Sequence, residues 1–430
     1  MLLPPSVRDL VPEGHTAHFV RELVRDVLDL SEIVSSYSEE RGYPPYNPVM
    51  MTALLLYAYS QGVYSSRKIA QACEERTDFM AVTAMQRPDF RTINSFRLRH
   101  ASALSRLFVQ VLRLCFASGL VKLGHVALDG TKIRANASKH RAMSYGRMKV
   151  REAELTAEVA GWFEEAEAAD ATDDSLHGVD RRGDELPEWV RDKRQRLERI
   201  RAAKAALEAE AAESVSGSDQ GSEAGASACG PSGHVRTVPP ERKQRNFTDP
   251  ESRIMKTSGG FEQAYNAQAA VDASSQVVVA AHVTNACNDS EQLHPMLDAI
   301  QSNTGRDPAE LSADSGYCSE RNLAELDRRG IRGYIATGRQ KHSSPWPIGP
   351  NLGPVGGRTR RMVQRLRCGG RRSRYRLRKQ SVEPVFGQIK AVRGFRQFLR
   401  RGLAAVADEW HLVCTAHNLL KLAKAGCRSA

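Results

Sequence analysis

The chain lacks any apolar run long enough to cross a membrane. Its first residues, MLLPPSVRDLVPEGH, interrupt a short apolar start with prolines and charges, so they do not form a secretory signal peptide. Its eight cysteines include no C-x-x-C pair, which excludes zinc spacing of that kind and predicts reduced thiols. We therefore expect a cytoplasmic protein without a membrane partner or a disulfide framework.

Acidic residues are scarce relative to basic ones. The 62 Lys and Arg outnumber the 50 Asp and Glu, giving a net charge of +12 and a pI of about 9.4. Residues 358–401 contain sixteen Lys and Arg but a single acid, Glu383. This balance favours a polyanionic partner, nucleic acid before membrane. Glu383 itself is either a salt-bridge partner or a metal ligand placed where a polyanion approaches.

The first 118 of the 430 residues have helical periodicity, which predicts an all-helical N-terminal domain. In YPPYNPVMMTALLLYAYSQ, Pro48 lies just inside the expected start of a buried helix. Short helices with Arg67 and Lys68 could form a DNA-binding helix-turn-helix-like module. The alternative is a packing or dimerisation bundle with solvated arginines.

The pattern changes after residue 118. Residues 119–146 contain an apolar strand, GHVALDGTKI, that we expect to end at Asp129, and residues 147–213 return to helical periodicity as an antiparallel hairpin insertion. Residues 214–240 are rich in Gly and Ser and predict a flexible linker. Residues 241–430 follow as β-hairpin, helix, strand, helix, strand and helix. The predicted fold class is α/β, a mixed sheet flanked by helices, preceded by the all-α domain and interrupted by the insertion.

Three acids stand near the ends of these elements: Asp129, Asp314 after the strand AELSA, and Glu383 on or at the start of the last core helix. Strand ends are the usual ligand sites of open α/β sheets. If the first strand neighbours the strand before Asp314, both aspartates enter one crevice. Such a trio suits phosphodiester chemistry, because Mg²⁺ prefers carboxylate oxygens and surrounding Lys and Arg can hold the DNA backbone. Taken singly, each acid is more often a turn former, a cap or a surface ion-pair partner.

Other residues receive more modest interpretations. Asp289 is expected to cap the helix DSEQLHPMLDAIQSN. Asn266 and Gln268 alternate along one strand, and we expect them at the sheet surface, with the active crevice as the alternative. Pro384 disfavours an α conformation at Glu383, so the helix should begin or kink there.

Several separated segments match one family. HVALDGTKIRANAS, FEQAYNAQAAVD, ADSGYCSERNL, and LRKQSVEPVFGQIK followed by RGFRQFLRRGL occur in this order. The chain resembles bacterial insertion-sequence transposases of the DDE class with a ribonuclease-H-like core, across nearly its whole length apart from about 147–240. The N-terminal segment PPYNPVMMTALLLYAYSQGVYSSRKI is also similar to that family. The resemblance implies a catalytic and metal-binding triad of Asp129, Asp314 and Glu383.

Related enzymes carry a Tyr, Arg, Glu, Lys signature around the last acid. Lys390 lies seven residues after Glu383 and matches the Lys. The Arg position falls on Lys379 and the Tyr position on Arg376, with Tyr375 adjacent. The resemblance thus implies DNA-contacting residues, which we take to be Lys390, Lys379, Arg376, Arg393, Arg67 and Lys68.

The resemblance implies an enzyme that binds transposon ends. Two Mg²⁺ or Mn²⁺ ions would support phosphodiester cleavage at the element end, and the freed 3′-hydroxyl would then attack target DNA. It also implies double-stranded DNA as partner, a homo-oligomer on DNA, and a bacterial, nucleoid-associated location. The alternatives are a decayed or repurposed DNA-binding protein and a metal-dependent nuclease without strand transfer.

Overall fold

The computed structural model describes residues 6–37, 46–177, 188–216, 238–257, 259–338, 356–369 and 373–429. Its contacts divide the chain into two compact units: Met1–Asn136 with Met255–Ala430, and Ala137–Ile254. Most of the predicted linker 214–240 lies outside the described residues. None of the described helices combines the length and hydrophobicity that a membrane span requires.

The N-terminal part of the first unit is helical, as predicted. Its helices are α1 (Thr16–Asp26), α2 (Ser31–Val34), α3 (Pro48–Ser60), α4 (Ser66–Glu75), α5 (Thr77–Thr83), α6 (Phe90–Arg99) and α7 (Ala101–Ala117). The Asn47 side chain caps α3 and Pro48 occupies its first turn, where a missing N–H costs nothing. Every residue from Met51 to Ser60 is buried, and each buried leucine contributes roughly 1.5–3 kcal/mol relative to exposure. Helix α3 is therefore the centre of this bundle.

The same unit contains one mixed β-sheet, formed by β1 (His125–Arg134), β4 (Arg253–Thr257), β5 (Gly260–Asp272), β6 (Val278–Thr284), β7 (Glu310–Ala313) and β8 (Arg332–Ile335). The strand order is β4-β5-β1-β7-β8, with β6 also paired to β5. β5 is antiparallel to both β1 and β6, whereas β7 is parallel to β1 and to β8. The predicted β-hairpin is confirmed as β5 and β6, and the condition that the first strand neighbours the strand before Asp314 is met by the β1–β7 pairing.

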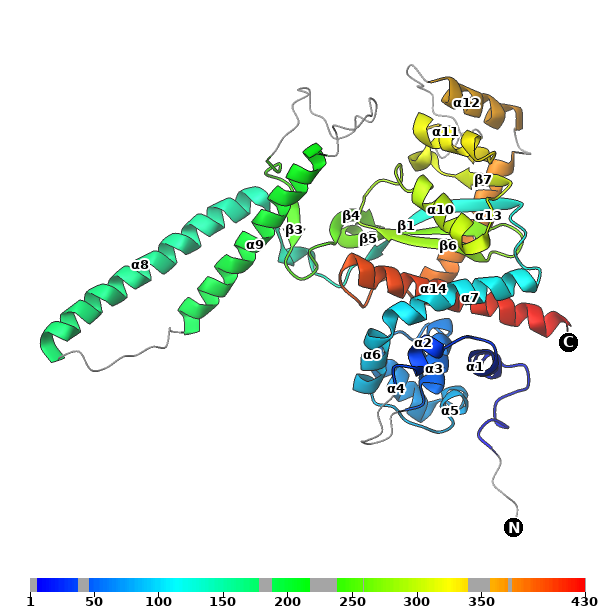
Figure 1. Ribbon diagram of the computed structural model, residues 1–430, viewed down its shortest axis with the longest axis horizontal. Helices are drawn as coiled ribbons and strands as arrows, with labels where there is room; N and C mark the ends of the chain where they lie inside the picture. Colours follow the sequence, from blue (N-terminus) through cyan, green and yellow to red (C-terminus); the bar gives the residue numbers. More distant parts are fainter. Residues whose placement is uncertain are drawn as a thin grey trace, which may run out of the picture. The chain divides into compact units, whose positions relative to one another are not determined.

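Helices pack around this sheet: α10 (Leu293–Thr304), α11 (Glu320–Arg328), α12 (Gly357–Gly369), α13 (Leu377–Gly387), the π-helical segment η6 (Gln388–Val392) and α14 (Leu403–Ser429). The 3-10 turns η3 (Ser315–Tyr317) and η5 (Arg374–Arg376) precede α11 and α13. α7 lies along α14, which also contacts α3 and β6 (Figure 1). The N-terminal helices are thus joined to the core through α14 rather than separated from it.

The predicted end of the first strand at Asp129 is wrong. β1 continues to Arg134 because β5 pairs with it along its whole length, from Val126 opposite Asp272 to Arg134 opposite Ala264. The parallel pairing with β7, however, stops at Ala127 opposite Ser312. Asp129 therefore lies in mid-strand but just beyond the end of its parallel neighbour.

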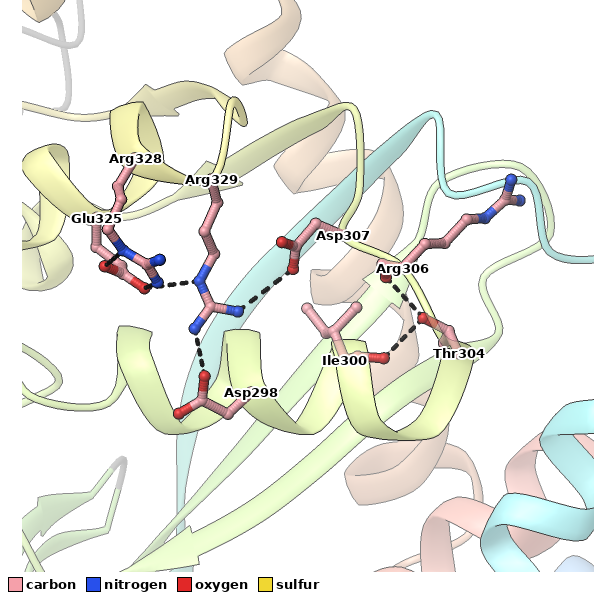
Figure 2. Close-up of polar contacts among 8 residues, drawn as sticks. All are labelled: Asp298, Ile300, Thr304, Arg306, Asp307, Glu325, Arg328 and Arg329. Atoms are coloured by element: carbon pink, nitrogen blue, oxygen red, sulfur yellow. Dashed lines mark hydrogen bonds and ion pairs between the residues drawn. The ribbon is translucent and has the colours of Figure 1, made fainter.

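A buried arginine fastens α10, α11 and the loop before β7 together (Figure 2). Arg329 pairs with Glu325 at 2.6 Å, with Asp307 at 3.4 Å and with Asp298, and its side chain is only 8% exposed. Arg328 adds two hydrogen bonds to Glu325, at 2.6 and 2.7 Å. We call Arg329 with these three acids the arginine clamp. It fixes the segment that leads into β7 and on to Asp314.

The second unit contains the predicted helical hairpin. α8 (Tyr145–His177) and α9 (Glu188–Ser216) run side by side, and β2 (Ala142–Ser144) pairs with β3 (Gln244–Asn246). The ion pairs Glu158–Lys193 and Glu152–Lys204 show that the two helices are antiparallel. Going forward along α8 from Glu152 to Glu158, the partner in α9 moves backward from Lys204 to Lys193. A core of Met148, Leu155, Leu197, Ile200 and Leu207 holds them together.

Candidate active site

Asp129 and Asp314 occupy corresponding positions on two parallel strands. Ala127 of β1 pairs with Ser312 of β7, and Asp129 and Asp314 each follow two residues after these partners. Asp314 follows β7 directly and caps η3, where its Oδ1 accepts the Gly316 N–H at 2.9 Å. Side chains in equivalent register point to the same face. The register therefore brings the two aspartates to the same end of the β1–β7 pair.

Glu383 reaches the same region from α13. The predicted helix start beside Pro384 is wrong, because α13 begins at Leu377 and runs through the proline. A proline inside a helix leaves the carbonyl four residues earlier without its N–H donor. Here the Gln276 side-chain amide donates to that Gln380 carbonyl at 2.9 Å. This contact from the β5–β6 turn supports the proline-containing turn that carries Glu383.

Arg378 connects two of the three acids. Its Nη1 lies 2.6 Å from Asp129 Oδ2 and its Nη2 3.1 Å from Glu383 Oε1. Arg378 and Asp129 are 13% and 16% exposed, whereas the Glu383 side chain is 46% exposed. The guanidinium also lies 5.9 Å from the centre of the Tyr375 ring. The pairing brings Glu383 to Asp129, with the open side of the site at Glu383.

The two aspartates are poorly suited to carry charge without a further cation. Burial raises the pKa of Asp129 to about 7, and neighbouring Asp314 and Asp289 act in the same direction against Arg378. Burial also raises the pKa of Asp314, opposed by its hydrogen bond from Gly316. Carboxyl groups whose pKa values are raised in this way cluster at functional sites.

The donor set suits a hard divalent cation, because it consists of carboxylate oxygens from β1, from the turn after β7 and from α13. Within the described residues, however, no three His, Cys, Asp or Glu side chains already surround a common metal position. Arg378 lies between Asp129 and Glu383 and supplies positive charge where an ion would stand. The residues fit a divalent ion in kind, and in this structure Arg378 occupies Asp129 Oδ2.

The predicted DNA contacts near Glu383 differ in their surroundings. Lys379 and Arg376 are exposed on the surface of α13 and η5. Lys390 is instead half-buried on η6, where its Nζ donates to Thr131 Oγ1 at 3.0 Å and to the Lys132 carbonyl at 3.1 Å. Burial, together with nearby Arg396, lowers the pKa of Lys390. Lys390 is thus tied to β1 through the two residues that directly follow Gly130.

The remaining predicted DNA contacts lie apart from the acids. Arg393 is half-buried and its Nη2 lies 3.0 Å from His417 Nδ1. Arg67 and Lys68 are exposed on α4, and the Arg67 guanidinium lies 5.1 Å from the Phe90 ring centre. The structure therefore does not bring these three residues to the carboxylates.

Sequence reasoning missed several residues of the site. Fixed spacing points to Lys379 and Arg376. The structure instead places Arg378, one residue before Lys379, against Asp129, with the Tyr375 ring beside its guanidinium. Asn266 and Gln268 were expected at the sheet surface, but both are fully buried and donate to Asp289. The physical reason is that both amides are buried where they can donate to the half-buried Asp289 carboxylate. A polar pair alternating in an otherwise alanine-rich strand was the available signal.

Comparison with known proteins identifies two segments. Residues 5–99 match the family model described as "Transposase domain (DUF772)", and residues 232–419 match "Transposase DDE domain". Searches of curated proteins and of solved structures find no match. The second segment includes Asp314, Glu383, Asp289 and α13, while Asp129 lies between the two matched segments. DDE transposases act on DNA and generally use divalent metal ions.

Proposed function

Since this chain belongs to the DDE transposases of insertion sequences, with the corresponding N-terminal transposase domain and a ribonuclease-H-like α/β core, we propose how it acts on DNA. It binds the ends of its own element, cleaves the DNA there and joins the freed 3′ ends to target DNA. The helical domain, 1–118, takes part in end recognition or dimerisation, and the enzyme works as a homo-oligomer on double-stranded DNA.

One observation carries this proposal: Asp129 and Asp314 each lie two residues beyond the last residue pair of two parallel strands, and Arg378 pairs with both Asp129 and Glu383. Buried carboxylates with raised pKa values are costly for stability. Their grouping beyond the end of the β1–β7 pairing is therefore better explained by ligand binding than by folding.

We assign a role to each residue. Asp129 is placed centrally, next to Arg378 and electrostatically coupled to Asp314, and would contribute to both of two ions; Asp314 and Glu383 would each hold one side. When bound, Mg²⁺ or Mn²⁺ supplies Lewis-acid stabilisation of the attacking and leaving oxygens. Arg378, once released from Asp129, remains positioned to contact a DNA phosphate. Lys390, Lys379 and Arg376 add positive charge along the same segment.

The test is cleavage and joining of DNA that carries the element's own ends, with Mg²⁺, with Mn²⁺ and with chelator. We expect metal-dependent nicking at the element end and covalent joining to a target duplex. Asp129→Asn, Asp314→Asn and Glu383→Gln should each abolish both reactions while leaving end binding within about threefold, because none of the three acids contributes positive charge to the DNA contact.

The outcomes separate the alternatives. Cleavage without joining would identify a nuclease and contradict the strand-transfer step. End binding without any cleavage, with every metal, would identify a DNA-binding protein. Unchanged cleavage in one of the three variants would remove that residue from the site. Lys390→Ala should weaken end binding with a salt slope shallower by about 0.9, the contribution of one phosphate contact.

A further inference from the structure

A fourth carboxylate lies beside the two aspartates. A Cβ atom placed on Gly130, next to Asp129, would lie 2.8 Å from Asp289 Oδ1, and one placed on Gly316, which donates to Asp314, would lie 3.5 Å from Asp289 Oδ2. Asp289 therefore lies close to Gly130, which follows Asp129, and to Gly316, which donates to Asp314. Glycine suits position 130 because a Cβ there would overlap the Gln268 amide and crowd the Asp289 carboxylate.

The loop that carries Asp289 is fastened to the turn after Asp314. The buried Asn322 amide donates to the Ser290 carbonyl at 2.7 Å and to the Tyr317 carbonyl at 2.8 Å. The expected capping of the following helix by Asp289 is wrong: α10 begins at Leu293, and its N-cap residue is Gln292, which makes no side-chain cap. The side chain of Asp289 turns to the sheet instead.

Two amides of β5 orient Asp289. Asn266 Nδ2 donates to Asp289 Oδ1 at 2.6 Å and Gln268 Nε2 at 2.7 Å. The Gln268 amide is itself oriented by the Tyr317 hydroxyl, which donates to Gln268 Oε1, and burial holds the pKa of Tyr317 well above its usual value. The described hydrogen bonds to the Asp289 side chain all reach Oδ1, which leaves Oδ2 on the Asp314 side.

Buried polar atoms without a hydrogen-bond partner point into the same place. Asn266 is fully buried, yet its Oδ1 has no partner among the described residues and lies 2.8 Å from the Cβ position of Gly130. Lys132 Nζ is likewise buried without a hydrogen bond, 3.6 Å from Asp289 Oδ1. An unsatisfied buried oxygen costs about 1–3 kcal/mol, so it signals a missing ligand such as water or a cation.

We propose that Asp289 is a fourth acid of the metal site, oriented by Asn266 and Gln268, with Oδ2 binding the ion on the Asp314 side directly or through water. This inference rests on the proposed function, because it assigns a further residue to the same metal site. The competing explanation is structural: Asp289 only offsets the charge of Lys132. A structural partner would affect stability but leave metal affinity unchanged.

The experiment measures Mn²⁺ binding to the full-length protein without DNA, using the electron paramagnetic resonance signal of free Mn²⁺. Asp289→Asn should weaken the tightest Mn²⁺ site by about 10–100-fold, the usual effect of losing an orienting or outer ligand. Glu291→Gln removes the same charge from an exposed position of the same loop and should stay within about twofold of wild type. The thermal midpoint without metal reports any structural cost of each variant separately.

Asn266→Ala provides a second variant in which Asp289 remains, and it should weaken Mn²⁺ binding by up to about tenfold. Wild-type Mn²⁺ affinity in Asp289→Asn, or in Asn266→Ala if the first variant does not fold, would overturn the inference. Asp314→Asn serves as the reference for the proposed function. If Asp314→Asn binds Mn²⁺ like wild type, the proposed metal site itself is wrong. If Asp314→Asn loses Mn²⁺ affinity but Asp289→Asn binds Mn²⁺ like wild type, only the assignment of Asp289 as a fourth acid is wrong.

Discussion

The arginine clamp and the candidate active site use the same residue types with opposite electrostatic results. In the clamp, hydrogen bonds from Arg328 and Arg329 lower the pKa of Glu325 to about 2. In the candidate site, burial raises the pKa of Asp129 to about 7 even though Arg378 lies 2.6 Å away. The clamp satisfies its acids, whereas the site leaves them short of positive charge.

This contrast separates stabilising charge clusters from functional ones. Arg329 of the clamp holds together two helices and a loop, so its geometry serves the fold. Around Arg378, Asp129, Asp314 and Asp289 repel one another in a largely buried place. That repulsion disfavours the folded state, and a bound cation would relieve it.

The largest expected effect comes from one matched substitution made in both clusters. Asp314→Asn should lower metal-dependent cleavage by a factor on the order of 10³ or more, because a ligand is lost. Its thermal midpoint should stay equal or rise, since the amide oxygen can still accept from Gly316. Asp307→Asn in the clamp should do the reverse, lowering the midpoint and leaving cleavage intact. Cleavage assays and thermal unfolding of both variants check this.

Arg329→Met should cost about 3 kcal/mol of unfolding free energy, because it leaves the largely covered carboxylates of Glu325 and Asp307 without their cation. Urea denaturation of the metal-free protein measures this loss. Arg361→Met offers a matched control on α12, where the arginine is 68% exposed and pairs with Asp327 at 3.4 Å. A loss in Arg329→Met no larger than in this control would show that the clamp does not stabilise the fold.

Metal affinity should depend on pH through Asp129. A proton and a cation compete for the same carboxylate, and the raised pKa keeps the proton bound up to about pH 7. The Mn²⁺ dissociation constant should therefore rise by about tenfold per pH unit below 7 and level off above it. A titration between pH 5.5 and 8.5 measures this; a constant affinity across that range would contradict the assignment.

The smallest effect concerns acid stability. The pKa of Glu325 is about 2 in the folded protein against 4.5 ordinarily, so its ion pairs stabilise the fold fully above pH 4.5. This contribution is lost as pH falls from about 4.5 to 2. Denaturation curves at several pH values should show a shallower decline in Glu325→Gln than in wild type. Equal slopes of stability against pH in the two proteins would mean that the pKa of Glu325 is not lowered in the folded state.

How far the sequence predicted these clusters depends on the range of the interactions. The sequence indicated that Asp129 would lie near Asp314 if their strands were neighbours, and only the structure supplies that pairing. The continuation of β1 past Asp129 was not predictable from its own residues, since it depends on pairing with β5. Pro384 was expected to limit α13, and the compensating Gln276 lies more than a hundred residues away in sequence.

Asp289 shows the same limit. An Asp before an apolar helical pattern is a common cap, and nothing local distinguishes it from a site acid. Its role emerges only when Asn266 and Gln268, on another strand, turn their amides toward it. Arg378 was not predicted as a site residue for a similar reason. Its distance along the chain from Glu383 does not determine which residue of α13 faces Asp129.

The central claim is that Asp129, Asp314 and Glu383 share a divalent ion after Arg378 withdraws. A crystal structure with Mn²⁺, using its anomalous scattering, tests this most directly. We predict an anomalous peak at coordination distance, roughly 2.1 Å, from Asp129 and at least one of the other two acids, with the Arg378–Asp129 pair broken. A saturated crystal in which that pair is intact, with no peak touching Asp129, would contradict the claim.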